Sequence, residues 1–143
     1  MSRNGDIFNI DLPPGWADET VCVFRGPKVG EKEHMVILAI DRESRYEGIE
    51  EMAFAKTAPV LEALGGAEVL KNEEITVEGG NPAWELVYKW IPAEGIKVFC
   101  RYVMVMSDGM GFTFSAEFTK QTLKTVGAQM KQVIGSLLPG TFE

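Results

Sequence analysis

Most of the chain consists of short runs in which apolar residues alternate with polar ones or form β-branched and aromatic stretches. Two such runs near the start, residues 20–25 and 34–41, predict strands, and the charged residues between them predict a hairpin loop. A strand is also predicted over 7–11, closed by the turn formers Leu12-Pro13-Pro14-Gly15-Trp16. Four further strands are separated by residues typical of turns between antiparallel neighbours. They are predicted over 69–77, 83–90, 96–106 and 110–118.

Two segments carry apolar residues at helical spacing. The first begins after Gly48, and Gly65-Gly66 predicts its end. Pro59 lies inside it and predicts either a kink or a join between two shorter helices, because proline removes a backbone donor and clashes with the preceding turn. The second helix is predicted to begin at Thr119, a good N-cap residue, and to end before Pro139.

This order of elements predicts an α+β fold, an antiparallel sheet of about six to seven strands flanked by two helices. We expect both helices to cover one face of the sheet. The strand predicted over 96–106 is apolar on both sides, with Met104 on one side and Val103 on the other. A sheet face in water should carry polar residues at every second position. The second face is therefore expected to be covered as well, by the fold itself, a second subunit or a partner.

Length and composition are those of one globular domain spanning residues 1–143. The chain is 45% hydrophobic and 24% charged, and its formal charge of −7 would repel a phosphate backbone or an anionic lipid surface. We therefore expect no nucleic acid among its partners. The start has no signal-like segment, and no stretch approaches the roughly 18 apolar residues of a membrane helix. The prediction is a cytoplasmic protein without membrane insertion.

Candidate catalytic groups are few and scattered. His34 is the only histidine, and its charged neighbours predict an exposed side chain without a special role. The acidic pairs Glu50-Glu51 and Glu73-Glu74 are expected to form solvated surfaces, since a hydrolase needs carboxylates that face each other across a cleft. No glycine-rich loop matches a phosphate-binding pattern. The sequence predicts no catalytic set, no metal site and no cofactor, hence a protein that is not an enzyme.

Only two cysteines occur, Cys22 and Cys100, and each lies in an apolar, β-branched run. Unpaired cysteine is among the most buried residue types, so two buried free thiols are the expected state. The sequence leaves a disulfide between the two runs geometrically possible, but the reducing environment of the cytoplasm argues against it.

Methionine and aromatic residues are concentrated in the predicted strands. Core packing explains most of them, but methionine also favours surfaces that accept varied apolar partners, because its side chain is flexible and polarizable. Their excess on strands that are apolar on both sides indicates a hydrophobic binding face. The residues are Met35, Trp84, Tyr88, Trp90, Tyr102, Met104, Met106, Met110, Phe112 and Phe114.

An ordered set of short motifs resembles a bacterial family that includes DcrB. The set comprises the opening stretch 8–24 with its turn Leu12-Pro13-Pro14-Gly15-Trp16, the stretch 35–42, Gly79-Gly80-Asn81-Pro82-Ala83, Tyr88-Lys89-Trp90, Arg101-Tyr102 and the C-terminal helix. The resemblance implies the PsbP-like fold, shared with the Ran-binding Mog protein. DcrB is an exported lipoprotein, and the lack of a lipoprotein signal here favours similarity to the cytosolic Eag-type chaperones of type VI secretion effectors.

That resemblance implies a non-enzymatic adaptor or chaperone, commonly a homodimer, that holds apolar N-terminal helices of an effector in a hydrophobic sheet groove. By position, the groove residues would be Val21, Val23, Met35, Ala39 and Tyr102. Two alternatives stay open: a small-molecule or lipid-binding module that uses the same apolar face, and an enzyme of unrecognised type. An open groove would favour a client helix, whereas a closed, deep pocket would favour a small ligand.

Overall fold

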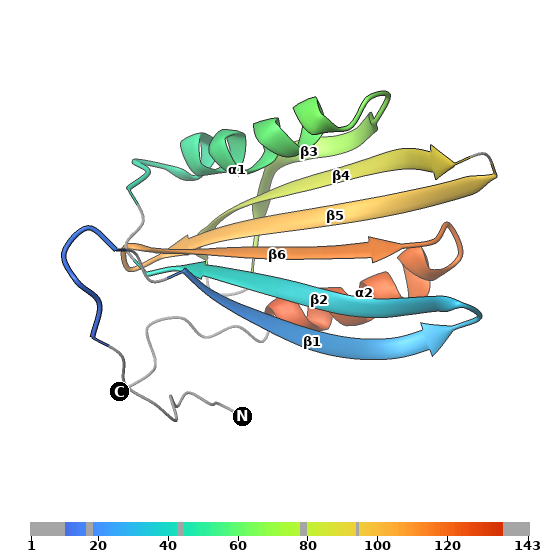
Figure 1. The fold of residues 1–143 in the computed structure, drawn as a ribbon, viewed down its shortest axis with the longest axis horizontal. Helices are drawn as coiled ribbons and strands as arrows, with labels where there is room; N and C mark the ends of the chain where they lie inside the picture. Colours follow the sequence, from blue (N-terminus) through green and yellow to red (C-terminus); the bar gives the residue numbers. More distant parts are fainter. Residues whose placement is uncertain (1–10, 17–18, 43–44, 78–79, 94, 136–143) are drawn as a thin grey trace.

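The computed structural model describes residues 11–16, 19–42, 45–77, 80–93 and 95–135. In this part of the chain, six strands form one sheet, and two helices pack against it (Figure 1). In chain order the elements are β1 (Glu19–Val29), β2 (Lys32–Asp41), α1 (Ile49–Ala63), β3 (Glu68–Thr76), β4 (Pro82–Ala93), β5 (Ile96–Ser107), β6 (Met110–Phe118) and α2 (Thr122–Gly135).

All neighbouring strands are antiparallel, in the order β1-β2-β6-β5-β4-β3. This confirms the predicted α+β class and the antiparallel sheet. The predicted strand 7–11 lies outside the described residues except for Asp11, which is not in a strand. The predicted turn at residues 12–16 is present: the Trp16 amide donates to the Pro13 carbonyl at 3.2 Å, and Gly15 has a φ of 93°.

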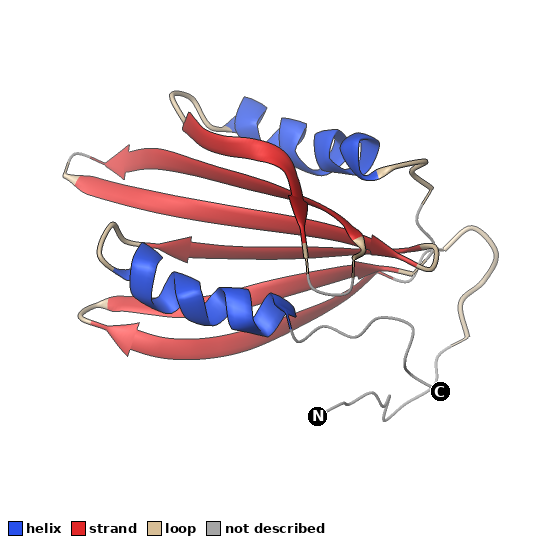
Figure 2. Ribbon diagram, turned by 180° about the vertical axis from the view of Figure 1, so that it is seen from behind, coloured by secondary structure: helices blue, strands red, loops and turns tan. Residues whose placement is uncertain are grey.

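Helix α2 covers one face of the sheet, seen from behind in Figure 2. Its Val126, Met130 and Ile134 pack into a core with Phe114 and Phe118 of β6. The predicted N-cap is confirmed: Thr119 Oγ1 accepts a hydrogen bond from the Thr122 amide at 3.1 Å, and the Leu123 amide donates to the Thr119 carbonyl at 3.0 Å.

Helix α1 packs on the opposite face, so the expectation that both helices cover the same face is wrong. Met52 and Ala53 contact Met104 of β5, whose side chain alternates with those that face α2. A Cβ placed at Gly111 would lie 3.0 Å from Met52 Cε. A glycine at this position thus lets α1 approach β6 closely. The helix continues through Pro59 as one element, so the alternative of two shorter helices is also wrong.

The prediction of an exposed His34 is wrong. The residue is 4% exposed, and its side chain lies on the α2 face together with Leu38. His34 Nδ1 lies 2.9 Å from the Pro27 carbonyl oxygen and Nε2 lies 2.9 Å from Thr122 Oγ1. Since a carbonyl only accepts, Nδ1 carries the donated proton. His34 thereby ties the β1–β2 hairpin to the first turn of α2.

A charged network is buried on the same face beneath α2. Glu85 of β4 is 5% exposed, and its Oε1 and Oε2 lie 2.8 Å from Lys71 Nζ and 2.9 Å from Arg101 Nε. Arg101 Nη1 also donates to the Gly127 carbonyl of α2 at 3.4 Å. The hydrogen bond to Glu85 and its negative charge raise the pKa of Lys71. The network therefore joins β3, β4, β5 and α2.

Candidate functional site

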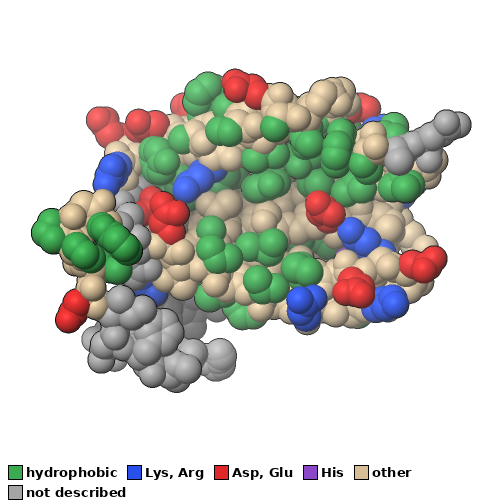
Figure 3. Space-filling model, in the orientation of Figure 1, with side chains coloured by type: hydrophobic (Ala, Val, Ile, Leu, Met, Phe, Trp, Pro, Cys, Tyr) green, Lys and Arg blue, Asp and Glu red, His purple; other side chains and the backbone are tan. Residues whose placement is uncertain are grey.

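The face that carries α1 is only partly covered. Helix α1 packs over β4 and β5, while the part of the same face formed by β1, β2 and β6 remains open (Figure 1). There, Val21 is 58% exposed, Val23 49% and Ile37 36%. Hydrophobic side chains gather on this side of the molecule in the space-filling view (Figure 3). Exposed apolar side chains on adjacent strands are typical of a binding surface.

Strand register determines which residues share this surface, because residues directly opposite each other in an antiparallel pair point to the same face. Val23 pairs with Ile37, which pairs with Ser115, which in turn pairs with Tyr102. Val21, Ala39, Thr113 and Met104 form the next row. We call this surface the open face and define it by Val21, Val23, Met35, Ile37, Ala39, Tyr102, Thr113 and Ser115.

The structure brings all five residues named from the sequence, Val21, Val23, Met35, Ala39 and Tyr102, onto the open face. Sequence reasoning missed Ile37, although it lies between Met35 and Ala39 at the same alternation. It also missed Thr113 and Ser115, whose polar side chains gave no apolar signal. Only the pairing of β6 between β2 and β5 reveals their place.

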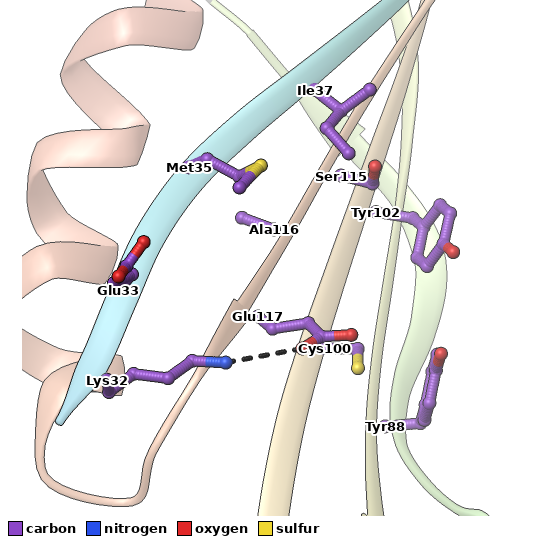
Figure 4. A pocket seen from close by; sticks show the side chains of 10 residues that line it. All are labelled: Lys32, Glu33, Met35, Ile37, Tyr88, Cys100, Tyr102, Ser115, Ala116 and Glu117. Carbon is purple, nitrogen blue, oxygen red and sulfur yellow. Dashed lines mark hydrogen bonds and ion pairs between the residues drawn. The ribbon is translucent and has the colours of Figure 1, made fainter. Parts of the chain in front are cut away.

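A hollow of about 330 Å³ lies at the end of the open face near the β1–β2 turn (Figure 4). Met35 and Ile37 line one side, and Tyr88 and Tyr102 line the other. The ring centroids of the two tyrosines are 6.3 Å apart. An ion pair of 3.3 Å between Lys32 Nζ and Glu117 Oε1 borders it. The hollow is open to solvent, so a ligand placed there would remain partly exposed.

Burial controls the ionisation of the groups at the base of this hollow. It raises the pKa of the Cys100 thiol, and it raises the pKa values of the Tyr88 and Tyr102 hydroxyls. All three groups are therefore neutral at pH 7. They supply a polarizable sulfur and an aromatic surface to the hollow.

The two cysteines are both free, as predicted, but only Cys100 is buried, while Cys22 is partly exposed. They point to opposite faces, since Cys22 packs with the α2 core and Cys100 with Tyr88. A disulfide between them within one chain is therefore excluded by the fold.

We expect iodoacetamide to alkylate Cys100 in the native protein on the order of tenfold or more slowly than Cys22, because the reactive species is the thiolate and burial disfavours it. The raised pKa means that the Cys100 rate should increase only at strongly alkaline pH. Mass spectrometry of tryptic peptides over a time course measures both rates. Equal rates in folded protein would contradict the burial of Cys100, and equal rates in urea serve as the control.

Nowhere in the described residues do three or more His, Cys, Asp and Glu side chains come close enough to hold a metal ion. Within the same ranges, neither helix has the length and apolar character needed to cross a bilayer.

Comparison with known proteins places the chain in a family. The model of the family described as DcrB matches residues 9–136. The chain belongs to the DcrB family. This confirms the resemblance at the family level, whereas the closer similarity to Eag-type chaperones stays a prediction. The sequence matches no curated protein.

Three solved structures of low sequence identity share the fold of this DcrB-family chain. PA94 from Pseudomonas aeruginosa, a protein of unknown function, has a TM-score of 0.72 and 21% identity, with 91% of this chain and 90% of PA94 covered. LpqN of Mycobacterium tuberculosis, involved in cell envelope biogenesis, has a TM-score of 0.55 and 15% identity, with 85% and 83% covered. Cyanobacterial PsbP from Synechocystis has a TM-score of 0.51 and 16% identity, with 72% and 65% covered. These likenesses support the PsbP-like fold.

Proposed function

We propose that this DcrB-family protein is a non-enzymatic adaptor or chaperone that holds an apolar helix of a client against the open face. The observation that carries the proposal is the exposure of Val21, Val23 and Ile37 beside a face that is otherwise covered by α1. Burying such apolar area is worth roughly 25 cal/mol per Å². Contact between a client helix and the open face would bury apolar area on both, and this burial would stabilise the complex.

The shape of the open face supports a helix over a small ligand. Its hollow is open along one side and is bordered by the exposed Glu117, whereas small-molecule sites enclose most of the ligand. Each strand of a sheet takes up about 4.8 Å, so the three uncovered strands form a strip roughly 14 Å wide, and an α-helix with side chains is about 10–12 Å wide. One helix thus fits beside α1 on this surface.

The apolar chemistry of the open face and the resemblance noted in the sequence support one class of client. We propose that the client is an apolar N-terminal helix of a type VI secretion effector, shielded in the cytoplasm before secretion. Such a helix exposes apolar area that would otherwise aggregate or insert into lipid. An apolar sheet face substitutes for the bilayer until the client is delivered.

The test is binding of a fluorescent peptide of about 20 apolar residues with lysines at both ends, followed by anisotropy. Wild-type protein should bind it, and Val23→Asp should abolish binding with little loss of stability, because a carboxylate on an open surface stays hydrated until a client buries it.

The matched control is Val69→Asp on β3, where a valine is 45% exposed outside the open face. This variant should bind the peptide like wild type. Failure of the wild-type protein to bind would overturn the proposal, as would equal binding by Val23→Asp. Thermal melts of both variants show whether either effect comes from unfolding.

A further inference from the structure

A second hollow lies on the face of the sheet that carries α2, opposite the open face. It has a volume of about 390 Å³, and residues from β3, β4, β5 and the second half of α2 line it. Seen from behind, the end of β3 lies beside the last turns of α2 (Figure 2). We call this hollow the α2 groove and define it by Lys71, Ile75, Glu85, Arg101, Val103 and Lys131.

Much of the lining of the α2 groove is apolar. Ile75 of β3 and Val77 just beyond it line the groove, as do Val103 of β5 and Ile134 of α2. All four side chains also pack in the core between the sheet and α2, so their positions are fixed. A bare inorganic ion would gain nothing from this surface, whereas an alkyl or aromatic group would be removed from water against it.

The charged part of the lining is mainly cationic, although the chain as a whole has a formal charge of −7. Lys71, Arg101 and Lys131 line the groove together with one carboxylate, that of Glu85, which leaves an excess of two positive charges. Glu73 lies 3.8 Å from Lys71 but does not line the groove. The α2 groove is therefore electrostatically complementary to an anion.

Two of these cations have unused hydrogen-bond donors. Arg101 Nη1 donates to the Gly127 carbonyl at 3.4 Å, whereas Nη2 donates to no residue in the described ranges. Arg101 Nε lies 2.9 Å from Glu85 Oε2, but this contact lacks hydrogen-bond geometry, so the buried Nε is unsatisfied. Lys131 is exposed and has no partner within the same ranges. Because the Arg101 side chain is only 12% exposed, an acceptor for its guanidinium group would be strongly stabilising.

We propose that the α2 groove binds a small amphipathic anion, in which a carboxylate or phosphate is joined to an alkyl or aromatic body. The anionic oxygens accept hydrogen bonds from Arg101 Nη2 and Lys131 Nζ, and the apolar body lies against Ile75 and Val103. A volume of about 390 Å³ lies within the range of small-molecule sites, roughly 300–1,000 Å³. Since the groove and the open face lie on opposite sides of the sheet, this inference is independent of the proposed client helix.

Octanoate, octanol and acetate test the charged head and the apolar body separately. Titration of the isotopically labelled full chain, followed by NMR chemical shifts, measures the three dissociation constants. Octanoate should bind at least about tenfold more tightly than octanol or acetate, since each of these lacks one of the two kinds of contact. The shifts should be largest at Val103 and Ile134. Octyl phosphate completes the series, and the tighter of the two anions identifies the preferred head group.

Variants of the cations test the role of each donor. Lys131→Gln should weaken octanoate binding about three- to fivefold and leave octanol binding unchanged. The matched control is Lys124→Gln, an exposed lysine of the same helix outside the groove, which should bind octanoate like wild type. The double variant Glu85→Met with Arg101→Met keeps the net charge but removes the guanidinium donor. It should lose most of the preference for octanoate over octanol.

Equal affinity of the wild-type protein for octanoate and octanol would overturn the proposal. Octanoate-induced shifts confined to the open face would also overturn it, because they would place the anion elsewhere. Equal weakening by Lys131→Gln and Lys124→Gln would count against it in the same way, since this would indicate unspecific attraction to surface lysines. Circular dichroism confirms that each variant is folded.

Discussion

Replacing Glu85 by methionine is expected to lower the free energy of unfolding by about 3 to 5 kcal/mol, because it leaves Arg101 buried without a counter-charge. Lys71 can turn its side chain to solvent, since that side chain is 41% exposed, but the side chain of Arg101 is only 12% exposed. Most of the cost therefore comes from the guanidinium group. Urea denaturation followed by circular dichroism measures the difference.

Two further variants identify the cause of this loss. Glu73→Gln removes an exposed carboxylate 3.8 Å from Lys71 and should change stability by less than about 0.5 kcal/mol. The double variant Glu85→Met with Arg101→Met removes both buried charges and should recover much of the loss, since apolar side chains of similar length can fill the same space. Equal losses for Glu85→Met and Glu73→Gln would contradict the role of burial.

Phe114→Ala on β6 is also expected to cost about 3 to 5 kcal/mol, through lost burial and the cavity that it leaves. Phe114 is 2% exposed and lies in the core between the sheet and α2. Its loss should appear as a lower urea midpoint with an unchanged slope.

Phe24→Ala is the matched control, since Phe24 points to the same face of the sheet from β1. It is 46% exposed and borders a small crevice beside α2, so its truncation should cost only about 1 kcal/mol. Alternation alone, which sends Phe24 to the helix-covered face, would predict a loss of about 3 to 5 kcal/mol for this truncation. Equal losses for the two variants would mean that α2 or a second molecule covers β1 more fully.

Alternation predicted the strands well because it depends on local burial. The strand 110–118 has the predicted bounds, and β2 begins two residues before the prediction, where Lys32 pairs with Val29. The same rule could have placed His34 on the α2 face, because it shares the alternation of Leu38. Its charged neighbours misled the prediction: Glu31 lies in the turn, and Lys32 and Glu33 begin β2 just before the strand enters the core.

Long-range pairing explains what the sequence could not give. Both faces of β5 are apolar, so its pattern does not say which helix covers which face. Glu85 and Arg101 each look like single charges in apolar strands, and their ion pair follows only from the β4–β5 register. On the open face, alternation along β1 was enough to predict the positions of its valines. The position of Ser115 could be predicted only with the knowledge that β6 lies beside β2.

The pairing of β2 with β6 also divides the chain into two folding segments. Every other neighbouring pair in the sheet is a hairpin of consecutive strands, while Ile37 and its partner Ser115 are about 80 positions apart. The β1–β2 hairpin and the meander from β3 to β6 can each form from local contacts. Joining them requires closure of a long loop, which costs entropy before its contacts form and sets a slow folding step. Until that step, β2 and β6 are both unpaired edges, so the newly made chain is most prone to aggregate in this interval.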